Sequence, residues 1–500
     1  MIKFFKKYHK WLGVIVTIVL ILFSISGIVL NHRDAFSDID VNRNILPNDF
    51  KYKNWNNAAV KSTEKINNDS IIIYGNIGIW LTDSTFNKFK DFNAGFPEGI
   101  DNKKICKIKL TSDKHLFAGT FLGLYEYNFS NSKWTKVELP TKEQRITDIT
   151  EVEGKLLIMS RSHIIKTSDY LKFNVKELPK PEDYDNKIGL FKTLWVIHSG
   201  EIYGEIGRYF VDFIALVIIF LSVTGIILFI NSYRIKNRQK KKVVVSNIKK
   251  TNRWNLKWHN KIGWITSILL LITTITGMFL RPPLLIPIAN SKIGKIPYTE
   301  LASPNPWFDK LRRVLYDEEN KRYIVATLDG FYYSDDNFNS NLKKFKFQPP
   351  ASVMGVTVIK KLKKNTYLIG SFMGAFIWHS NTGEIIDYIT KKPYIKPKKA
   401  GSPIGKYKIT GMAKDFTKGD VFFDYDIGAF SINKNKFSEM PIQIEKQALS
   451  LWNLALEFHT GRIYGSLIGD FYILVVPLAG LMMIFIVISG FVVWFKRHRK

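Results

Sequence analysis

The sequence predicts a membrane protein with a four-helix transmembrane bundle, formed from two parallel repeats, and a β-rich, propeller-like domain outside the membrane. Three observations lead to this fold class: four long apolar runs, a motif that occurs twice ahead of such runs, and short aromatic strands at regular spacing. With 500 residues, 46% of them hydrophobic, the chain is too apolar to be disordered and long enough for several cores.

The four apolar runs lie at 11–30, 209–230, 262–280 and about 471–495. Each is roughly 19 to 25 residues long, which as a helix matches a hydrocarbon core about 30 Å thick. The first run follows basic residues, as the apolar part of a signal peptide does. Because a similar sequence recurs around His259, far from the start of the chain, we expect the first run to be a retained anchor.

The formal net charge of +30 is concentrated in three short segments without Asp or Glu, at 1–10, 231–258 and 496–500. Positively charged segments next to apolar helices face the cytoplasm, which predicts an N-in, C-in topology with two large segments outside. This placement argues against a nucleic-acid partner and indicates contact with anionic membrane lipid.

The chain divides near residue 245 into two similar units. The stretch HSGEIYG at 198–204 returns as HTGRIYG at 459–465, and the sequence around His9 returns around His259. Both units run in the same direction, so we expect a parallel repeat with a pseudo-two-fold axis along the membrane normal. The second unit has four extra residues in its return helix, which is close to one helical turn and should preserve the facing of that helix.

The repeat and the charges together define seven segments. They are a first transmembrane helix at 1–32, a first β-rich half at 33–187, an interfacial and second transmembrane helix at 188–232, a basic cytoplasmic loop at 233–256, a third transmembrane helix at 257–282, a second β-rich half at 283–447, and an interfacial and fourth transmembrane helix at 448–500.

The outer segments combine β-branched and aromatic runs with Gly breaks, which is the pattern of paired strands. Six such pairs are predicted, at 71–81, 115–127, 155–165, 322–333, 366–378 and 420–432. Their turns lie 40 to 54 residues apart within each half, close to the spacing of propeller blades. The six pairs fit one six-bladed ring, two half-propeller sandwiches or two independent β domains.

Six of the nine histidines lie near the ends of the apolar runs: His9, His32, His198, His259, His459 and His498. The repeat matches His9 with His259 and His198 with His459, whereas His32 and His498 are left without a partner. In the first and third helices, glycines four and eighteen residues after the histidine share its face: Gly13, Gly27, Gly263 and Gly277. A flat macrocycle could lie close to the backbone there.

Two histidines on different helices suit a b-type haem, which needs no contiguous motif. We predict an inner haem whose iron binds His9 and His259, and an outer haem whose iron binds His198 and His459. Four cations are placed for the propionates: Arg208, Arg281, Lys10 and Lys261. The same residues fit a plainer interpretation, in which the histidines are polar contacts between helices and the glycines allow close packing.

The only cysteine, Cys106, leaves no intrachain disulfide, no thiolate cluster and no C-x-x-C-H site for covalent haem. Nucleotide-binding, zinc-protease and serine-hydrolase motifs are also missing from the sequence. If the protein is a reductase, it would therefore receive its electrons from another molecule.

This pattern resembles the PepSY-associated transmembrane family, iron-regulated inner-membrane proteins that include ferric-siderophore reductases. The resemblance rests on His9-Lys10-Trp11-Leu12-Gly13 with Ser26-Gly27, on the repeat around His259 and Gly277, and on His198-Ser199-Gly200 leading to Thr224-Gly225. It covers the four helices and implies a bacterial inner-membrane protein with two haems b that passes electrons to a periplasmic ferric chelate. The outer segments depart from the family pattern, with propeller-like repeats and no PepSY module.

The sequence therefore predicts a haem b electron-transfer protein that takes electrons from a cytoplasmic reductase or quinol. As an enzyme it would be a ferric-chelate (siderophore) reductase in iron uptake, since reduction weakens the binding of iron by hard oxygen ligands. One alternative is a membrane-anchored periplasmic sensor or partner-binding platform without redox activity. Another is a transporter, which would need a broken helix at the midplane that the sequence does not indicate.

Overall fold

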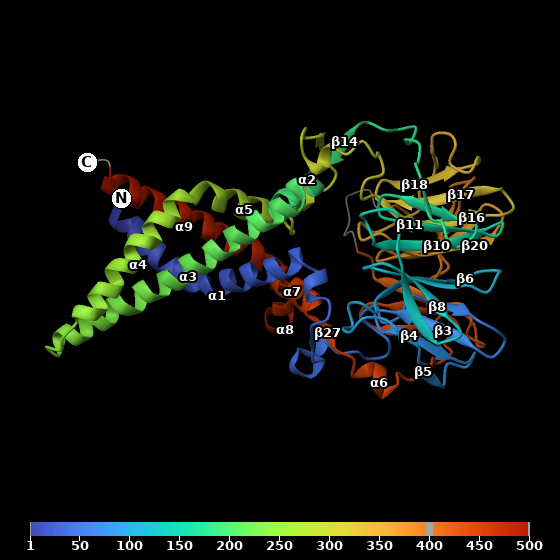
Figure 1. Cartoon of the computed structure of the whole chain (residues 1–500), viewed down its shortest axis with the longest axis horizontal. Helices are drawn as coiled ribbons and strands as arrows, with labels where there is room; N and C mark the ends of the chain where they lie inside the picture. Colours follow the sequence, from blue (N-terminus) through green and yellow to red (C-terminus); the bar gives the residue numbers. More distant parts are fainter. Residues whose placement is uncertain (1, 397–403, 499–500) are drawn as a thin grey trace. The chain divides into compact units, whose positions relative to one another are not determined.

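The computed structural model describes residues 2–396 and 404–498, which form two compact units (Figure 1). The helical unit comprises 2–36, 186–303 and 451–498. The β unit comprises the described parts of 37–185 and 304–450. Both outer segments of the sequence thus contribute to a single β unit, and the alternative of two independent β domains is wrong.

Three segments of the helical unit are long and apolar enough to cross a membrane. They are α1 (Ile2–Asn31), the segment Glu201–Lys240 with α3 (Gly204–Lys240), and the segment Arg462–His498 with α8 (Gly465–Ile468) and α9 (Val475–His498). A fourth candidate consists of α4 (Ser246–Ile265) and α5 (Ser267–Phe279), which are bent by 64° relative to each other. The protein is therefore a membrane protein with a large extramembrane β unit.

The bend corrects our expectation of an uninterrupted third helix. Around the break, Thr266 donates a hydrogen bond from its side chain to the carbonyl of Ile262, and Ser267 donates one to Trp264, both at 2.8 Å. Side-chain hydroxyls that bond back to the preceding turn compete with the backbone ladder and bend helices.

Two further expectations about helix ends also differ from the structure. Segment 233–256 is mostly helical, since α3 continues to Lys240 and α4 begins at Ser246, and its Lys, Arg and Gln residues are good helix formers. The extra residues of the second unit do not extend one continuous helix. A 3₁₀ segment, Gly469–Leu474, follows α8 there, and Gly469 has a φ of +56°.

The helices pack around a shared apolar core. α1 contacts α3 and α9, and α4 contacts the same two helices. Short helices precede the last two long ones, α2 (Leu190–Ser199) before α3 and α7 (Leu451–His459) before α9. The buried core side chains come from α3, α5 and α9: Ile214, Val217, Leu270, Met483 and Val487. A small antiparallel pair, β14 (Lys187–Gly189) with β15 (Lys292–Gly294), also belongs to this unit.

The β unit contains four antiparallel four-stranded sheets and one seven-stranded sheet. In each four-stranded sheet the strands lie in chain order. The two sheets of the first outer segment are β6 (Ile105–Leu110), β7 (Leu116–Thr120), β8 (Leu124–Asn128) and β9 (Lys133–Val137), and then β10 (Ile146–Val152), β11 (Lys155–Ser160), β12 (Ile164–Thr167) and β13 (Asn174–Lys176). The two sheets of the second outer segment are β16 (Leu311–Asp317), β17 (Arg322–Thr327), β18 (Gly330–Ser334) and β19 (Lys343–Lys344), and then β20 (Val356–Lys363), β21 (Thr366–Ser371), β22 (Gly374–His379) and β23 (Ile385–Asp387).

The seven-stranded sheet joins the two outer segments. It contains β2 (Ser62–Lys65), β3 (Ile71–Gly75), β4 (Gly78–Thr82), β5 (Phe89–Asp91), β24 (Ile409–Ala413), β25 (Val421–Asp424) and β26 (Gly428–Ser431). β24 pairs with β2 in parallel, with Met412 opposite Ser62. A short pair, β1 (Asp40–Val41) with β27 (Leu449–Ser450), joins the same two segments, and α6 (Ile442–Glu445) precedes β27.

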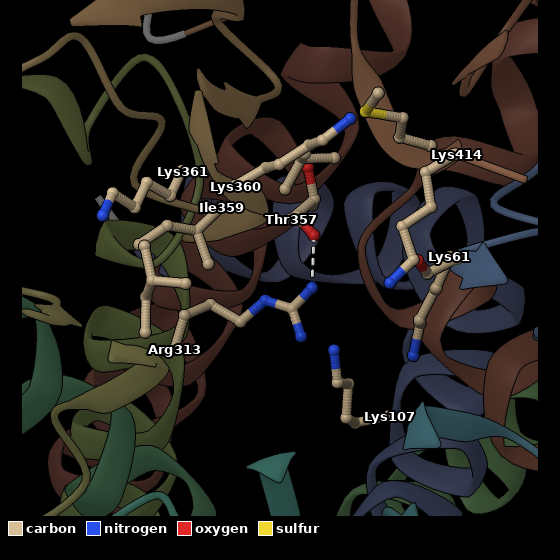
Figure 2. A pocket seen from close by; sticks show the side chains of 12 residues that line it. Lys61, Lys107, Arg313, Thr357, Ile359, Lys360, Lys361 and Lys414 are labelled. Carbon is tan, nitrogen blue, oxygen red and sulfur yellow. Dashed lines mark hydrogen bonds between the residues drawn. The ribbon is translucent and has the colours of Figure 1, made fainter. Parts of the chain in front are cut away.

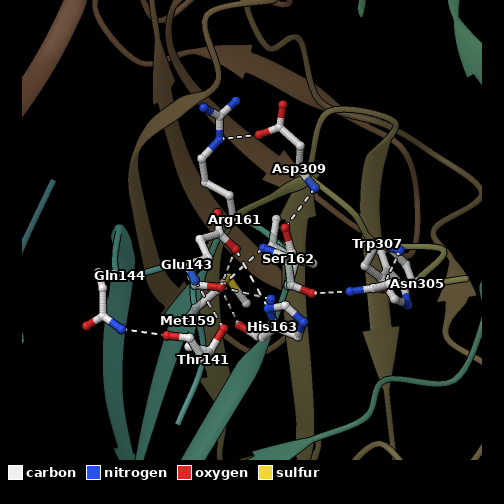
Figure 3. Close-up of polar contacts among 12 residues, drawn as sticks. Thr141, Glu143, Gln144, Met159, Arg161, Ser162, His163, Asn305, Trp307 and Asp309 are labelled. Carbon is white, nitrogen blue, oxygen red and sulfur yellow. Dashed lines mark hydrogen bonds and ion pairs between the residues drawn. The ribbon is translucent and has the colours of Figure 1, made fainter. Parts of the chain in front are cut away.

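All six predicted strand pairs are confirmed as antiparallel hairpins: β3–β4, β7–β8, β11–β12, β17–β18, β21–β22 and β25–β26. Contacts between strands run in the order β2, β6, β10, β16, β20, β24 and back to β2, and β24 and β2 belong to the same seven-stranded sheet. Figure 3 shows one junction between the outer segments, where the side chain of Asn305 donates to the carbonyl of Ser162 at 2.8 Å and Arg161 forms an ion pair with Asp309.

Candidate functional site

The four histidines matched by the repeat form two pairs in the helical unit. The ring centroids of His9 and His259 lie 6.2 Å apart, and those of His198 and His459 lie 5.9 Å apart. The members of each pair come from different helices, α1 and α4 for the first and α2 and α7 for the second. The structure thus brings together the residues that we proposed as partners.

A hydroxyl on another helix holds the Nδ1 atom of each imidazole. The contacts are His9 with Ser489 at 3.1 Å, His459 with Ser26 at 3.1 Å, His259 with Thr224 at 2.9 Å and His198 with Thr276 at 3.5 Å. For three of the four histidines, Nδ1 is also within hydrogen-bond distance of the backbone carbonyl three residues before that hydroxyl. These contacts are His9 with Ile486 at 3.0 Å, His459 with Phe23 at 3.0 Å and His198 with Thr273 at 2.9 Å.

These contacts determine which nitrogen carries the proton. The hydroxyl of Ser26 donates its single hydrogen to the carbonyl of Leu22 at 2.6 Å, so its oxygen can only accept from His459. Thr276 donates in the same way to the carbonyl of Ile272 at 2.7 Å. Nδ1 is therefore the protonated nitrogen, and Nε2 keeps its lone pair. Across residues 2–396 and 404–498, none of the four Nε2 atoms has a hydrogen bond.

A glycine directly after each hydroxyl residue makes room for the imidazole. A Cβ atom on that glycine would meet Cε1 of the histidine at 2.6 Å for Gly277, 3.1 Å for Gly490, 3.3 Å for Gly27 and 3.6 Å for Gly225. Gly27 and Gly277 thus lie against a histidine ring from another helix, a contact that the sequence did not predict. Gly13 has no atom within 4 Å of such a Cβ, and Gly263 has only Leu221 at 3.8 Å, so these two keep open space.

The sequence reasoning used Ser26 and Thr224 only as motif residues, and it predicted no histidine contact for Ser26, Thr224, Thr276 or Ser489. A signal was present, because each is followed by a glycine inside an apolar run. It could be read only once the partner helices were known, since each hydroxyl acts on a histidine of another helix.

The four cations expected near the propionates have different surroundings. Arg208 forms an ion pair with Glu201 at 3.6 Å. The amino group of Lys10 lies over the ring of Tyr233 at 4.7 Å, and that of Lys261 lies over a tryptophan ring. Arg281 has a buried Nε atom without a hydrogen-bond partner among the described residues. Arg281 is therefore the cation best able to receive a carboxylate.

The two unassigned histidines do not join a pair. His32 lies 2.5 Å from a carboxylate oxygen of Asp212 and stacks on Tyr209. His498 bonds to the carbonyl of Trp494 at 2.9 Å, one turn earlier in its own helix.

Each histidine pair offers two neutral nitrogens to a metal ion. Two imidazoles that bind one ion from opposite sides, with bonds of about 2 Å, place their ring centroids about 6 Å apart. In the described part of the chain, no group of three or more His, Cys, Asp or Glu side chains could hold a metal. Two imidazoles from different helices at this centroid separation are a ligand set that haem iron uses, so the residues fit haem.

Comparison with known proteins gives one family and several distant structures. The family model described as the PepSY-associated TM region matches residues 180–497. No curated protein matches the chain.

Among solved structures, the chain is similar to the extracellular domains of two proteins of B. thetaiotaomicron that are described as hybrid two-component systems, at 10% and 11% identity and TM-scores of 0.36 and 0.32. It is also similar to PorZ, a bacterial surface component of the type-IX secretion system of Porphyromonas gingivalis, at 8% identity and a TM-score of 0.31. These matches cover 74%, 76% and 73% of this chain, but only 32%, 40% and 38% of the other chains.

Proposed function

The chain belongs to the PepSY-associated transmembrane family, and we propose that it is a haem b electron-transfer protein of the bacterial inner membrane. The observation that carries this proposal is a pair of imidazoles from different helices with ring centroids about 6 Å apart, each with Nδ1 at hydrogen-bond distance from a further helix. This arrangement occurs twice, at His9 with His259 and at His198 with His459.

Haem b, when bound, supplies reversible one-electron exchange at its iron. Nε2 of each histidine would bind the iron, and the carbonyl or hydroxyl bonded to Nδ1 fixes the ring and increases its basicity. The open space beside Gly13 and Gly263 suits a flat ring, and Arg281 suits a propionate.

The two histidine pairs lie near opposite ends of α1. His9 and Ser26, which holds His459, are seventeen residues apart, or about 25 Å along the helix. This separation suits a carrier that connects the two faces of a bilayer. In the proposed N-in, C-in topology, a cytoplasmic reductase or quinol donates electrons on the inner side, and a periplasmic ferric chelate of the siderophore type accepts them on the outer side.

We also propose that the four spans form one bundle and that the β unit is a six-bladed propeller. The bundle is supported by the contacts of α1 and α4 with both α3 and α9. The propeller is supported by the six confirmed hairpins and by the parallel pairing of β24 with β2.

Stopped-flow absorbance tests the function. The haem-supplemented full-length protein in detergent is reduced with dithionite, freed of excess reductant and mixed with a ferric trihydroxamate and a ferrous-iron trap. We expect oxidation of the protein together with formation of trapped Fe(II). A protein that stays reduced, while a soluble ferric-chelate reductase releases Fe(II) under the same conditions, would contradict reductase activity.

A membrane-anchored binding platform without redox activity is the second candidate. It is favoured by a basic pocket in the β unit. The two candidates differ in one property, because a platform shows no b-type absorbance after haem supplementation.

A further inference from the structure

A pocket with a volume of about 220 Å³ lies in the β unit, among the first strands of its sheets (Figure 2). Its charged lining residues are all cationic: Lys61, Lys107, Arg313, Lys360, Lys361 and Lys414. They come from positions in or next to β2, β6, β16, β20 and β24, so nearly every sheet contributes one. No Asp or Glu lines the pocket.

Carboxylates outside the pocket balance only part of this charge. Lys361 lies 2.6 Å from Asp317, and Arg313 lies 3.4 Å from Asp148. The ion pairs of Lys360 and Lys414 are longer, at 3.7 and 3.9 Å. Within the described residues, Lys61 and Lys107 have no carboxylate at ion-pair distance.

Four of these cations, including the two without a carboxylate partner among the described residues, point into the same space. Figure 2 shows the amino groups of Lys61, Lys107 and Lys414 converging with the guanidinium group of Arg313. Arg313 is held in place by donating to the carbonyl of Thr357 at 2.5 Å.

The surroundings of Lys61 disfavour its positive charge. Burial lowers the pKa of Lys61, and the positive charges of Arg313 and Arg145 lower it further, although the Cys106 thiol opposes them. Its amino group donates to Sγ of Cys106 at 3.7 Å, a weak acceptor, and lies 4.8 Å from the centroid of the Phe121 ring. Cations held together without counter-charge are unfavourable, and a bound anion would remove that cost.

We propose that this pocket binds a small anion with two or more negative charges carried on clustered oxygens, as in a polycarboxylate or a phosphate ester. The volume admits a molecule of about that size. The N–H donors of Arg313 that are not used by Thr357 and Asp148 can bond to an oxygen of the anion, and the lysines act as point charges around the rest. This inference is independent of haem binding and holds for an electron carrier and a binding platform alike.

Isothermal titration calorimetry of the full-length protein in detergent tests the proposal, with citrate and pyrophosphate as separate probes and acetate as the monovalent control at equal ionic strength. We expect saturable one-to-one binding of at least one trivalent or tetravalent probe, no saturation with acetate, and weaker binding as NaCl is raised. Binding of citrate alone assigns a carboxylate ligand, and binding of pyrophosphate alone assigns a phosphate ligand.

The matched variants are Lys61→Gln/Lys107→Gln in the pocket and Lys88→Gln/Lys133→Gln on the exposed surface of the same unit. The pocket variant should bind at least tenfold more weakly, whereas the surface variant should bind like the wild type. Equal loss in both variants, or no saturable binding of either probe, would overturn the proposal.

Thermal unfolding without added anion checks that the pocket variant is folded. Because the substitutions remove mutually repelling charges, its unfolding temperature should equal or exceed that of the wild type. A decrease of several degrees would assign these lysines a role in the stability of the β unit and would likewise overturn the proposal.

Discussion

The imidazole rings of His198 and His459 have their centroids 5.9 Å apart, although their positions in the sequence differ by 261. Each ring is fixed by a hydroxyl and a carbonyl of a further helix, α5 for His198 and α1 for His459. The position of the pair therefore depends on four helices at once. This dependence makes the contacts around the rings testable one at a time.

Removing the hydroxyl that holds His459 should weaken haem binding at the outer pair. In Ser26→Ala, the imidazole keeps its bond to the Phe23 carbonyl but loses the 3.1 Å contact with the hydroxyl. Loss of such an outer-shell partner costs about 10- to 100-fold in metal affinity. Haem titration followed by absorbance measures the effect. Ser24→Ala, which changes another buried serine of α1, is the control, and equal affinities of the two variants would contradict the assigned role.

Adding a methyl group behind His198 should displace its ring. In Gly277→Ala, the new Cβ would lie 2.6 Å from Cε1 of His198, whereas in Gly225→Ala it would lie an ordinary 3.6 Å from Cε1 of His259. We expect the first variant to lose about half of its bound haem and the second to retain nearly all of it. Haem content per protein, measured by the pyridine haemochrome assay, decides this. Full retention by Gly277→Ala would show that the ring position is not required.

The pairing of β2 with β24, on which the proposed closed ring depends, can be trapped with a disulfide. Ser62 in β2 and Met412 in β24 are paired across parallel strands, a separation that cysteines can bridge. In a Cys106→Ser background, Ser62→Cys/Met412→Cys should oxidise to a cross-linked form with altered mobility on a non-reducing gel. The control pair Ser62→Cys/Met354→Cys should remain reduced. Equal cross-linking of both pairs would indicate that β2 and β24 are not specific neighbours.

Asp317 should stabilise the β unit in a pH-dependent way. Burial alone would raise the pKa of Asp317, but hydrogen bonds from Lys361, Tyr367 and Asn320 outweigh it and lower the pKa to about 2. Its contribution, roughly 2 kcal/mol, is complete above the unfolded-state pKa of about 4 and declines as the pH falls toward 2. Asp317→Asn should therefore unfold at a lower temperature than the wild type at pH 6, with a smaller difference at pH 3. An equal difference at both pH values would contradict this role.

Much of the β unit could be predicted from the sequence because hairpins are encoded locally, and the histidine pairing could be predicted because the chain repeats itself. Alternating apolar residues with a glycine turn define a hairpin such as β21–β22, and a constant offset relates His9 to His259. The contacts of Gly27 and Gly277 could not be predicted, because the imidazoles that they receive belong to helices distant in sequence.

The bend between α4 and α5 and the basic pocket could not be predicted either, because both depend on the folded chain. Thr266 and Ser267 resemble other hydroxyl residues of apolar helices, and only the folded chain shows their back-bonding at the break. Lys61, Lys107 and Arg313 each look like an ordinary surface cation in a basic sequence. Their convergence follows from the order in which the sheets contact one another.

The reduced-minus-oxidised absorbance spectrum of the haem-supplemented full-length protein tests the central claim most directly. We predict a b-type band in the wild type, about half of it in His198→Ala/His459→Ala, and about half in His9→Ala/His259→Ala. His32→Ala/His498→Ala should retain the full band. Absence of the band from the wild type, or its loss in the His32→Ala/His498→Ala variant with the paired histidines intact, would contradict the account.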